Sequence, residues 1–180
     1  MSRVIETPRL ELRPWLPADA DAASAIYTPQ TVSRWLGPDD RLLRTPAVVR
    51  RQVAEWSAED VSSDCVGHWA VGLRFTSAVV GALTLEHAPP GGESLTIGWA
   101  LAPDAWGHGY ATEAGDALVR WAIHEGGVDE VFAIIEPDNT RAKATAERIG
   151  MEWVTELGHL ADDGRSQVYR IRHEDLDYED

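Results

Sequence analysis

Residues 106–115 read WGHGYATEAG, where Gly107 and Gly109 are separated by one residue and precede a helix-forming run. The first backbone N–H groups of a helix have no intrahelical partners and lie at the positive end of the helix dipole. Glycine adopts backbone angles that other residues avoid, and it lets an anion approach the main chain closely. The stretch is therefore either a phosphate-binding turn that needs no lysine or a turn with a purely structural role.

Glycine spacing by itself does not choose between these two interpretations. The third glycine of the dinucleotide-binding pattern G-x-G-x-x-G would fall on Thr112, which excludes that motif. No Gly-Lys-Ser/Thr follows the turn, which excludes a Walker A loop. The choice between a phosphate-binding turn and a structural turn therefore depends on the strands and helices around it.

These elements are predicted from hydrophobic periodicity and from cap and turn residues. Strands are expected where apolar residues alternate with polar ones or form short runs, at residues 10–13, 68–75, 78–87, 95–103, 130–137, 152–158 and 165–173. Helices are expected where apolar residues recur every three or four positions, at residues 22–27, 47–60, 111–124 and 139–150. This order predicts an α+β fold with a mixed sheet, rather than a repeated βαβ array, in one domain over residues 1–180.

Single residues support three of these elements. Asp19 or Asp21 is placed to cap the first helix, and Asn139 is placed to cap the last, which Gly150 would end. Residues 76–77, between two apolar runs, predict a short hairpin connection.

Composition limits the classes of partner. The net charge is −14, from 16 Lys+Arg against 30 Asp+Glu, so nucleic acid is not expected as the main partner. An acidic surface would attract cationic molecules, or it would only keep the protein in solution. The single cysteine excludes an internal disulfide and a thiolate metal cluster. No stretch approaches the roughly 20 apolar residues of a membrane span, so a cytoplasmic location without a membrane partner is expected.

Three stretches resemble the GNAT N-acetyltransferases, particularly the RimJ/RimL branch that acetylates protein N-termini. Residues 97–114, IGWALAPDAWGHGYATEA, resemble the acetyl-CoA-binding motif of that family. Residues 7–15, TPRLELRPW, resemble the opening strand of the branch, and residues 134–151 resemble its asparagine helix. The resemblance implies the GNAT fold, in which a mostly antiparallel twisted sheet is flanked by helices and its central strands splay apart. It also implies transfer of an acetyl group from acetyl-CoA to an amine.

The resemblance assigns the contacts of acetyl-CoA residue by residue. The pyrophosphate would bind the main-chain amides of Gly107, His108, Gly109, Tyr110, Ala111 and Thr112. The pantetheine arm would insert beside residues 95–102, with main-chain partners at Trp99, Ala100 and Leu101 and a hydrogen bond from Asn139. Arg141 or Lys143 could approach the adenosine phosphate, although a helix cap and a solvated helix face are the alternatives for these three residues. Direct transfer would release coenzyme A and needs no metal ion.

Two positions with chemical roles depart from the branch. Ala142 replaces a serine that is proposed to protonate the leaving thiolate, and Thr96 replaces the glutamate of Glu-x-Gly-Tyr/Trp. A neutral amine is needed for attack, so a base is expected to take its proton. Glu86, at the end of an expected strand, is the first candidate for this base and Glu136 the second, with His87 and bulk water as alternatives. His68 and Tyr169, on expected strands, are interpreted as packing or surface residues.

The acceptor pocket of the resembling family is built from regions equivalent to residues 27–44 and 158–166. Three tryptophans could line it or pack in the core, namely Trp15, Trp35 and Trp56. Four loop acids could attract a cationic amine, namely Asp39, Asp40, Asp162 and Asp163. The acceptor stays open among a peptide α-amine, a polyamine and an amine-bearing antibiotic. A catalytically degenerate acyl-CoA sensor remains the alternative function, and the chain is expected as a monomer or homodimer.

Overall fold

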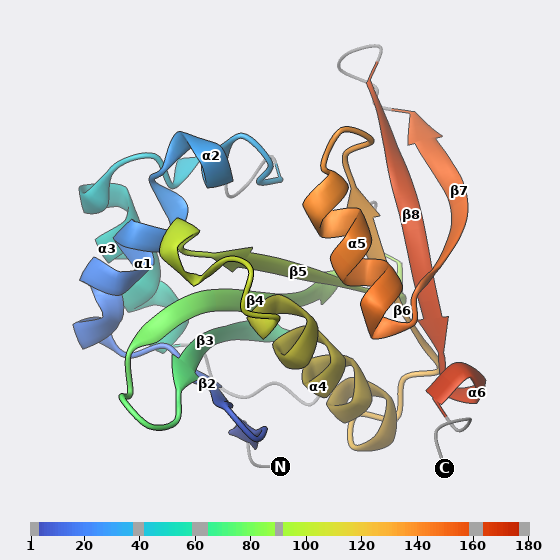
Figure 1. Ribbon diagram of the computed structural model, residues 1–180, viewed down its shortest axis with the longest axis horizontal. Coiled ribbons are helices and arrows are strands. Elements are labelled where there is room, and N and C mark those ends of the chain that lie inside the picture. The colour runs from blue at the N-terminus through green and yellow to red at the C-terminus, as the bar shows by residue number, and fades with distance from the viewer. Residues whose placement is uncertain (1–3, 38–41, 59–64, 89–91, 159–163, 177–180) are drawn as a thin grey trace.

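An eight-stranded sheet forms the centre of the computed structural model, which describes residues 4–37, 42–58, 65–88, 92–158 and 164–176 (Figure 1). The strand order is β1-β2-β3-β4-β5-β6-β8-β7. Neighbouring strands are antiparallel except for β5 and β6, which are parallel. The predicted α+β fold with a mixed, mostly antiparallel sheet is therefore confirmed.

The elements follow the predicted order. The strands are β1 (Ile5–Glu6), β2 (Leu10–Pro14), β3 (Gly67–Leu73), β4 (Val79–His87), β5 (Leu95–Leu101), β6 (Glu130–Ile135), β7 (Glu152–Gly158) and β8 (Arg165–Arg172). The α-helices are α1 (Ala20–Tyr27), α2 (Gln30–Ser33), α3 (Pro46–Ser57), α4 (Tyr110–His124), α5 (Thr140–Ile149) and α6 (His173–Leu176). Two short 3₁₀ turns are η1 (Pro17–Asp19) and η3 (Pro103–Ala105). In the described part of the chain, no helix is long and apolar enough to cross a membrane.

The two faces of the sheet bury different side chains, because successive residues of a strand point to opposite faces. Large residues such as Trp69, Leu83 and Ile97 form one core with α4 and α5. Alanines at the intervening positions, Ala70 and Ala82 among them, form a second core with residues of α1 and α3. Figure 1 shows α1, α2 and α3 grouped together, apart from α4 and α5. The sheet therefore separates two helical layers.

Two local predictions were wrong in detail. Asp19 occupies the N-cap position of α1, but its side chain makes no capping hydrogen bond, because its carboxylate accepts hydrogen bonds from Arg13 and from the N–H of Leu16. The hairpin connection between β3 and β4 spans residues 74–78 rather than two residues, and Ser77 adopts a left-handed φ of 58° within it. In the first case the carboxylate has other hydrogen-bond donors than the start of α1, and in the second the turn is longer than a two-residue hairpin.

The Arg13–Asp19 pair predicts a pH-dependent contribution to stability. Burial would raise the pKa of Asp19, but the hydrogen bonds from Arg13 (2.7 and 3.0 Å) and from Leu16 N–H (2.8 Å) outweigh burial and lower it. Asp19→Ala is expected to lower the free energy of unfolding at neutral pH by about 2 kcal/mol, since it removes hydrogen bonds to charged groups. The carboxylate stabilises the fold above its ordinary pKa, so the loss should disappear as the pH falls through the lowered pKa of Asp19.

Asp21→Ala is the matched control, because Asp21 is exposed and pairs with Arg50 at the surface over 3.4 Å. Such a pair contributes less than about 1 kcal/mol. Urea unfolding at several pH values measures both variants. Equal losses for the two, or a loss at Asp19 that does not change with pH, would contradict the prediction.

Candidate active site

The glycine turn, residues 106–109, leads from η3 into α4. Gly107 and Gly109 have φ of 78° and 76°, in the left-handed region that favours glycine. In the described chain, the first main-chain hydrogen bond of α4 runs from Glu113 N–H to the carbonyl oxygen of Gly109 over 3.1 Å. The amides that precede Glu113 therefore open the helix without an intrahelical acceptor, which is the arrangement that binds an anion.

Arg9, just before β2, holds this turn in place. Its Nη1 donates to the carbonyl oxygen of His108 over 2.9 Å, and its Nε donates to Oε2 of Glu113 over 2.6 Å. Burial would raise the pKa of Glu113, but hydrogen bonds from Thr7 and Arg9 outweigh burial and lower it. The ring of His108 stacks on Tyr110 at 5.3 Å, and the Arg9 guanidinium lies 4.9 Å from the centre of the Tyr110 ring. The side chains of the turn are thus packed, and main-chain amides remain as its anion-binding groups.

The two central strands splay apart just before the turn. The register of β5 with β6 ends at the pair Thr96–Phe132, here called the splay vertex. Beyond the vertex, β5 continues to pair with β4 as far as Leu101. This part of β5 contains Trp99, Ala100 and Leu101. One edge of it pairs with β4, and the other edge has no register with β6. This opening runs along β5 from the vertex toward the glycine turn.

The start of α5 reaches the glycine turn across this opening. Oδ1 of Asn139 accepts a hydrogen bond from the N–H of Ala142 over 3.2 Å, so the predicted helix cap is confirmed. The guanidinium of Arg141 lies 4.1 Å from the centre of the Trp106 ring, and Nε1 of Trp106 donates to the carbonyl oxygen of Leu101 over 3.1 Å. Arg141 is therefore held beside the turn, while the amide nitrogen of Asn139 is not used by the cap.

Arg141 and Lys143 occupy different faces of α5. Two residues correspond to a rotation of about 200° around a helix with 3.6 residues per turn. Lys143 is half-buried, and its main-chain N–H donates to the carbonyl oxygen of Asn139 over 3.1 Å. The contact of Arg141 with Trp106 makes Arg141 the better placed of the two cations for a phosphate at the turn.

A cavity of about 270 Å³ joins the predicted acceptor region to the predicted cofactor residues. It lies between α2 and the start of α5, and its lining residues are Thr31, Arg34, Trp35, Asp138, Asn139, Thr140 and Arg141. The Arg34 guanidinium lies 4.4 Å from the centre of the Trp35 ring. Trp35 thus lines a cavity, whereas Trp15 and Trp56 are core residues, 1% and 4% exposed. The four predicted loop acids, residues 39–40 and 162–163, lie outside the described residues.

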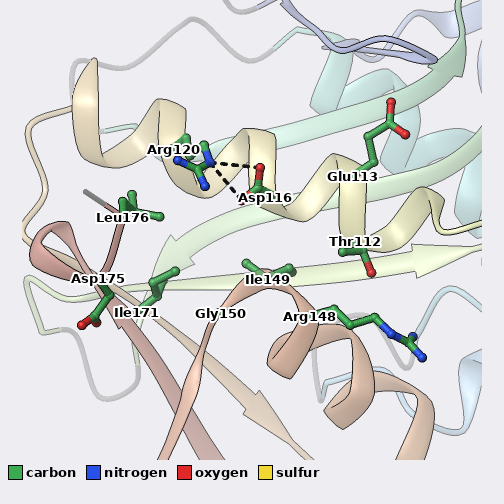
Figure 2. Close-up of a pocket in the computed structure, with 10 residues that line it drawn as sticks. All are labelled: Thr112, Glu113, Asp116, Arg120, Arg148, Ile149, Gly150, Ile171, Asp175 and Leu176. Atoms are coloured by element: carbon green, nitrogen blue, oxygen red, sulfur yellow. Dashed lines mark hydrogen bonds and ion pairs between the residues drawn. The ribbon is translucent and has the colours of Figure 1, made fainter. Parts of the chain in front are cut away.

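A second cavity, of about 300 Å³, lies between α4 and the end of α5 (Figure 2). It begins at Thr112 and extends past the ion pair of Arg120 with Asp116 (3.0 Å) to Asp175 and Leu176. Its charged lining residues are three acids and two arginines, Glu113, Asp116, Asp175, Arg120 and Arg148. This balance disfavours a phosphate, so the anion site is better placed at the glycine turn itself.

The first candidate base, Glu86, lies beside the splay vertex. It pairs across β4 and β5 with Thr96, whose Oγ1 donates to the main-chain oxygen of Glu86 over 3.2 Å. Its Oε1 is 3.3 Å from Nε2 of His68 on β3, and this hydrogen bond lowers the pKa of Glu86. The next residue, His87, is exposed and points to the other face of the sheet, as alternation along a strand requires.

The second candidate, Glu136, lies farther from the vertex. It follows the end of β6, four residues beyond Phe132, and its main-chain oxygen accepts from the N–H of Asn139 over 3.0 Å. At the usual rise of a strand this is roughly 13 Å from the vertex. Glu86 therefore lies beside the vertex, where β5 and β6 still pair, and Glu136 lies at the open end of the splay, where they no longer do.

The comparisons with known proteins agree with this geometry. Residues 9–152 match the family model of the acetyltransferase (GNAT) domain. The chain is similar to YoaA of Bacillus subtilis (strain 168), an uncharacterized N-acetyltransferase, with 22% identity over 152 residues that cover 84% of each protein.

Solved structures show the same fold. An acetyltransferase of the GNAT family from Bacillus anthracis matches with a TM-score of 0.80 and 23% identity, over 95% of this chain and 99% of that one. RimL, a ribosomal α-N-protein acetyltransferase in complex with coenzyme A, matches with a TM-score of 0.75 and 15% identity, over 94% of this chain and 97% of that one. The matched residues 9–152 include β2, the splayed strands, the glycine turn and α5. The chain therefore belongs to the GNAT family of acetyltransferase domains, a family that uses acetyl-CoA.

Proposed function

We propose that this protein is an N-acetyltransferase that moves the acetyl group of acetyl-CoA directly to a primary amine. The observation that carries the proposal is the junction of the splay with the glycine turn. The end of β5 has an edge that does not pair with β6. A few residues later α4 begins, and its first amides have no intrahelical acceptor. A molecule with a linear arm and a pyrophosphate fits such a junction, since the arm can pair with a strand edge and the anion can bind the helix start.

The residues at this junction suit each part of acetyl-CoA. The amide nitrogen of Asn139 is left over from the helix cap and can bind the arm, and Arg141 is held beside the turn by Trp106. The amides proposed for the pyrophosphate are those of Gly107, His108, Gly109, Tyr110, Ala111 and Thr112. The main-chain groups proposed for the arm are those of Trp99, Ala100 and Leu101.

The chain's own chemical task is to hold the acceptor and move a proton. Acetyl-CoA, when bound, supplies a thioester carbon that an amine attacks, so that an amide bond forms, the carbon–sulfur bond breaks and coenzyme A leaves as the thiol. Glu86 would take the proton of the acceptor's ammonium group, because its lowered pKa keeps it ionised at neutral pH. Its side chain is 54% exposed, so the proton can return to solvent. Glu136 is the second candidate for this role.

A protein or peptide α-amine is proposed as the acceptor, as in the RimJ/RimL branch. An α-ammonium gives up its proton more readily than a lysine ammonium to any base, because their ordinary pKa values are about 7.7–8.0 and about 10.4. The fold likeness to RimL, which is named as an α-N-protein acetyltransferase, supports the same choice.

Thiol release from acetyl-CoA, measured across a panel of amines, tests this function. We expect release with peptides that have a free N-terminus and none with the same peptides after chemical N-acetylation. Polyamines and aminoglycosides complete the panel. Coenzyme A at about 100 times its Kd should also stabilise the protein by about 2.7 kcal/mol in thermal unfolding.

The outcomes separate the rival functions. Release with only polyamines or aminoglycosides would overturn the α-amine acceptor but not acetyl transfer. Stabilisation by coenzyme A without release for any amine would favour the acyl-CoA sensor, which the loss of the family's usual residues at Thr96 and Ala142 motivates. No stabilisation by coenzyme A would contradict the cofactor site itself.

A further inference from the structure

Polar residues form two neighbouring cross-strand rows beside the splay vertex, on the face of the sheet that carries α1 and α3. In the first row, Thr84 of β4 lies between His68 of β3 and Gly98 of β5. In the second row, Glu86 of β4 lies beside Thr96 of β5. Across β3, β4 and β5, the adjoining row toward the core consists of alanines, Ala70, Ala82 and Ala100. The polar groups therefore begin where the apolar packing under α1 and α3 ends.

Glu86 occupies the space next to the carboxylate that the resembling branch places at position 96. Residues directly opposite each other on antiparallel strands have Cβ atoms about 4.5–5.5 Å apart and point to the same face. Glu86 and Thr96 therefore lie side by side on the same face of the sheet, next to the splay vertex.

The Glu86 carboxylate has a partner that holds it. Nε2 of His68 lies 3.3 Å from Oε1 of Glu86, and the His68 ring stacks on Trp56 of α3 with centres 4.7 Å apart and planes 21° apart. The His68 side chain is 16% exposed, whereas the Glu86 side chain is 54% exposed. The imidazole is therefore fixed by packing, while the carboxylate that it binds stays accessible to an acceptor.

We propose that His68 is the positioning residue of Glu86, holding its carboxylate on the face of the sheet that carries α1 and α3, where the acceptor's ammonium group is deprotonated. This inference rests on the proposed acetyl transfer and assigns His68 a role that its place on a strand did not suggest. The proton moves from the ammonium nitrogen to Glu86, and His68 keeps its hydrogen bond to the carboxylate throughout. Trp56 connects the pair to α3 in the helical layer next to the acceptor region.

Among the described residues, His68 is the titratable group that contacts the Glu86 carboxylate. From β5, the facing residue is Thr96, which is uncharged. On α3, Arg51 and Glu55 lie 4.0 Å apart and are exposed, and Arg50 pairs with Asp21 of α1 over 3.4 Å. Farther along the row, past Phe132 of β6, Arg170 pairs with Glu130 over 3.6 Å. The hydrogen bond from His68 accordingly accounts for the lowered pKa of Glu86.

A double-mutant cycle with His68→Phe and Glu86→Gln tests the proposal. Phenylalanine preserves the stack on Trp56 but removes the hydrogen bond, so kcat/KM for the acceptor peptide should fall about tenfold, as for the loss of one hydrogen bond to a charged group. In the Glu86→Gln background the same change should alter kcat/KM by less than about twofold, because coupled residues are not additive. Equal losses in both backgrounds, or no loss in either, would show that His68 does not act through Glu86.

Two further variants separate positioning from folding. His68→Gln keeps an N–H donor and should recover most of the activity that His68→Phe loses; failure to do so would count against the hydrogen bond. His124→Gln is the matched control, because His124 is an exposed histidine at the end of α4, and its activity should equal that of the wild type. A loss at His124 as large as that at His68 would overturn the assignment.

A second readout does not depend on catalysis. Carboxyl-carbon NMR of Glu86, assigned with Glu86→Gln, should show its pKa rising toward the ordinary value in His68→Phe and staying low in His124→Gln. An unchanged pKa in His68→Phe would overturn the pairing even if acetyl transfer were confirmed. If no amine supported thiol release, this titration would still decide whether the pair exists, so failure of the proposed function and failure of this inference are distinguishable.

Discussion

Replacing Glu86 with glutamine is expected to lower kcat/KM for the acceptor amine by about 100-fold to 10,000-fold, the usual contribution of a positioned general base. Glutamine has nearly the shape of glutamate but cannot take a proton at neutral pH. The Kd for coenzyme A should not change, because Glu86 lies beside the splay vertex on β4 rather than at the glycine turn. Thiol release at saturating acetyl-CoA measures the rate, and titration calorimetry with coenzyme A measures the affinity.

Glu6→Gln is the matched control for this change. Glu6 is also a half-exposed glutamate on a strand, and its Oε2 lies 3.4 Å from Nη2 of Arg74, so the variant loses a comparable ion pair without affecting the splay. Glu136→Gln is the rival variant. If Glu136→Gln lost activity while Glu86→Gln kept it, the base would have to be assigned to Glu136 at the open end of the splay.

Replacing Gly109 with valine is expected to weaken coenzyme A binding by at least about 100-fold while the protein still folds. An added Cβ would meet only Nη2 of Arg9, at an ordinary contact distance of 3.5 Å, so no collision opposes folding. The left-handed φ of 76° makes valine unfavourable by about 1–2 kcal/mol. The turn would therefore change its backbone conformation, or the valine side chain would block access to its amides. Loss of two hydrogen bonds to an anion accounts for a hundredfold change. Calorimetry with coenzyme A gives the affinity.

Gly127→Val provides a control with the same backbone strain. Gly127 has a φ of 69°, nothing lies within 4 Å of an added Cβ, and the residue follows the opposite end of α4. The melting temperature should therefore fall by a similar amount in both variants, and only Gly109→Val should bind coenzyme A more weakly. Equal affinities of the two variants for coenzyme A would show that the glycine turn does not bind the anion.

Most of the fold could be predicted because its signals are local. Alternation at Leu10 and Leu12 placed β2, and the spacing of Val49, Val53 and Trp56 placed the buried face of α3. Asn139 and Gly150 marked the two ends of α5. Where the prediction failed, as at Asp19, a distant partner had taken the side chain away from its local role. Arg13, six residues earlier in the chain, binds the carboxylate that was expected to cap α1.

The candidate site divides in the same way. The glycines of the turn, the asparagine of α5 and the missing acid at Thr96 could be read from single positions, because each depends on backbone conformation or residue type. Arg9 could not be found, because nothing local indicates that it would bind Glu113, 104 residues away in the chain.

The sequence by itself determined that a helix begins with two glycines after a strand, and it left open whether this turn binds an anion or is only structural. Only the tertiary structure decided which side chains surround that feature. Strand register brings His68 of β3 to Glu86 of β4, and helix packing brings Trp56 over His68 and Arg141 over Trp106. Register and packing depend on the whole sheet, since a shift of one residue would send every side chain of a strand to the other face. The proposed donor site is therefore encoded locally, while the proposed acceptor site depends on the assembled fold.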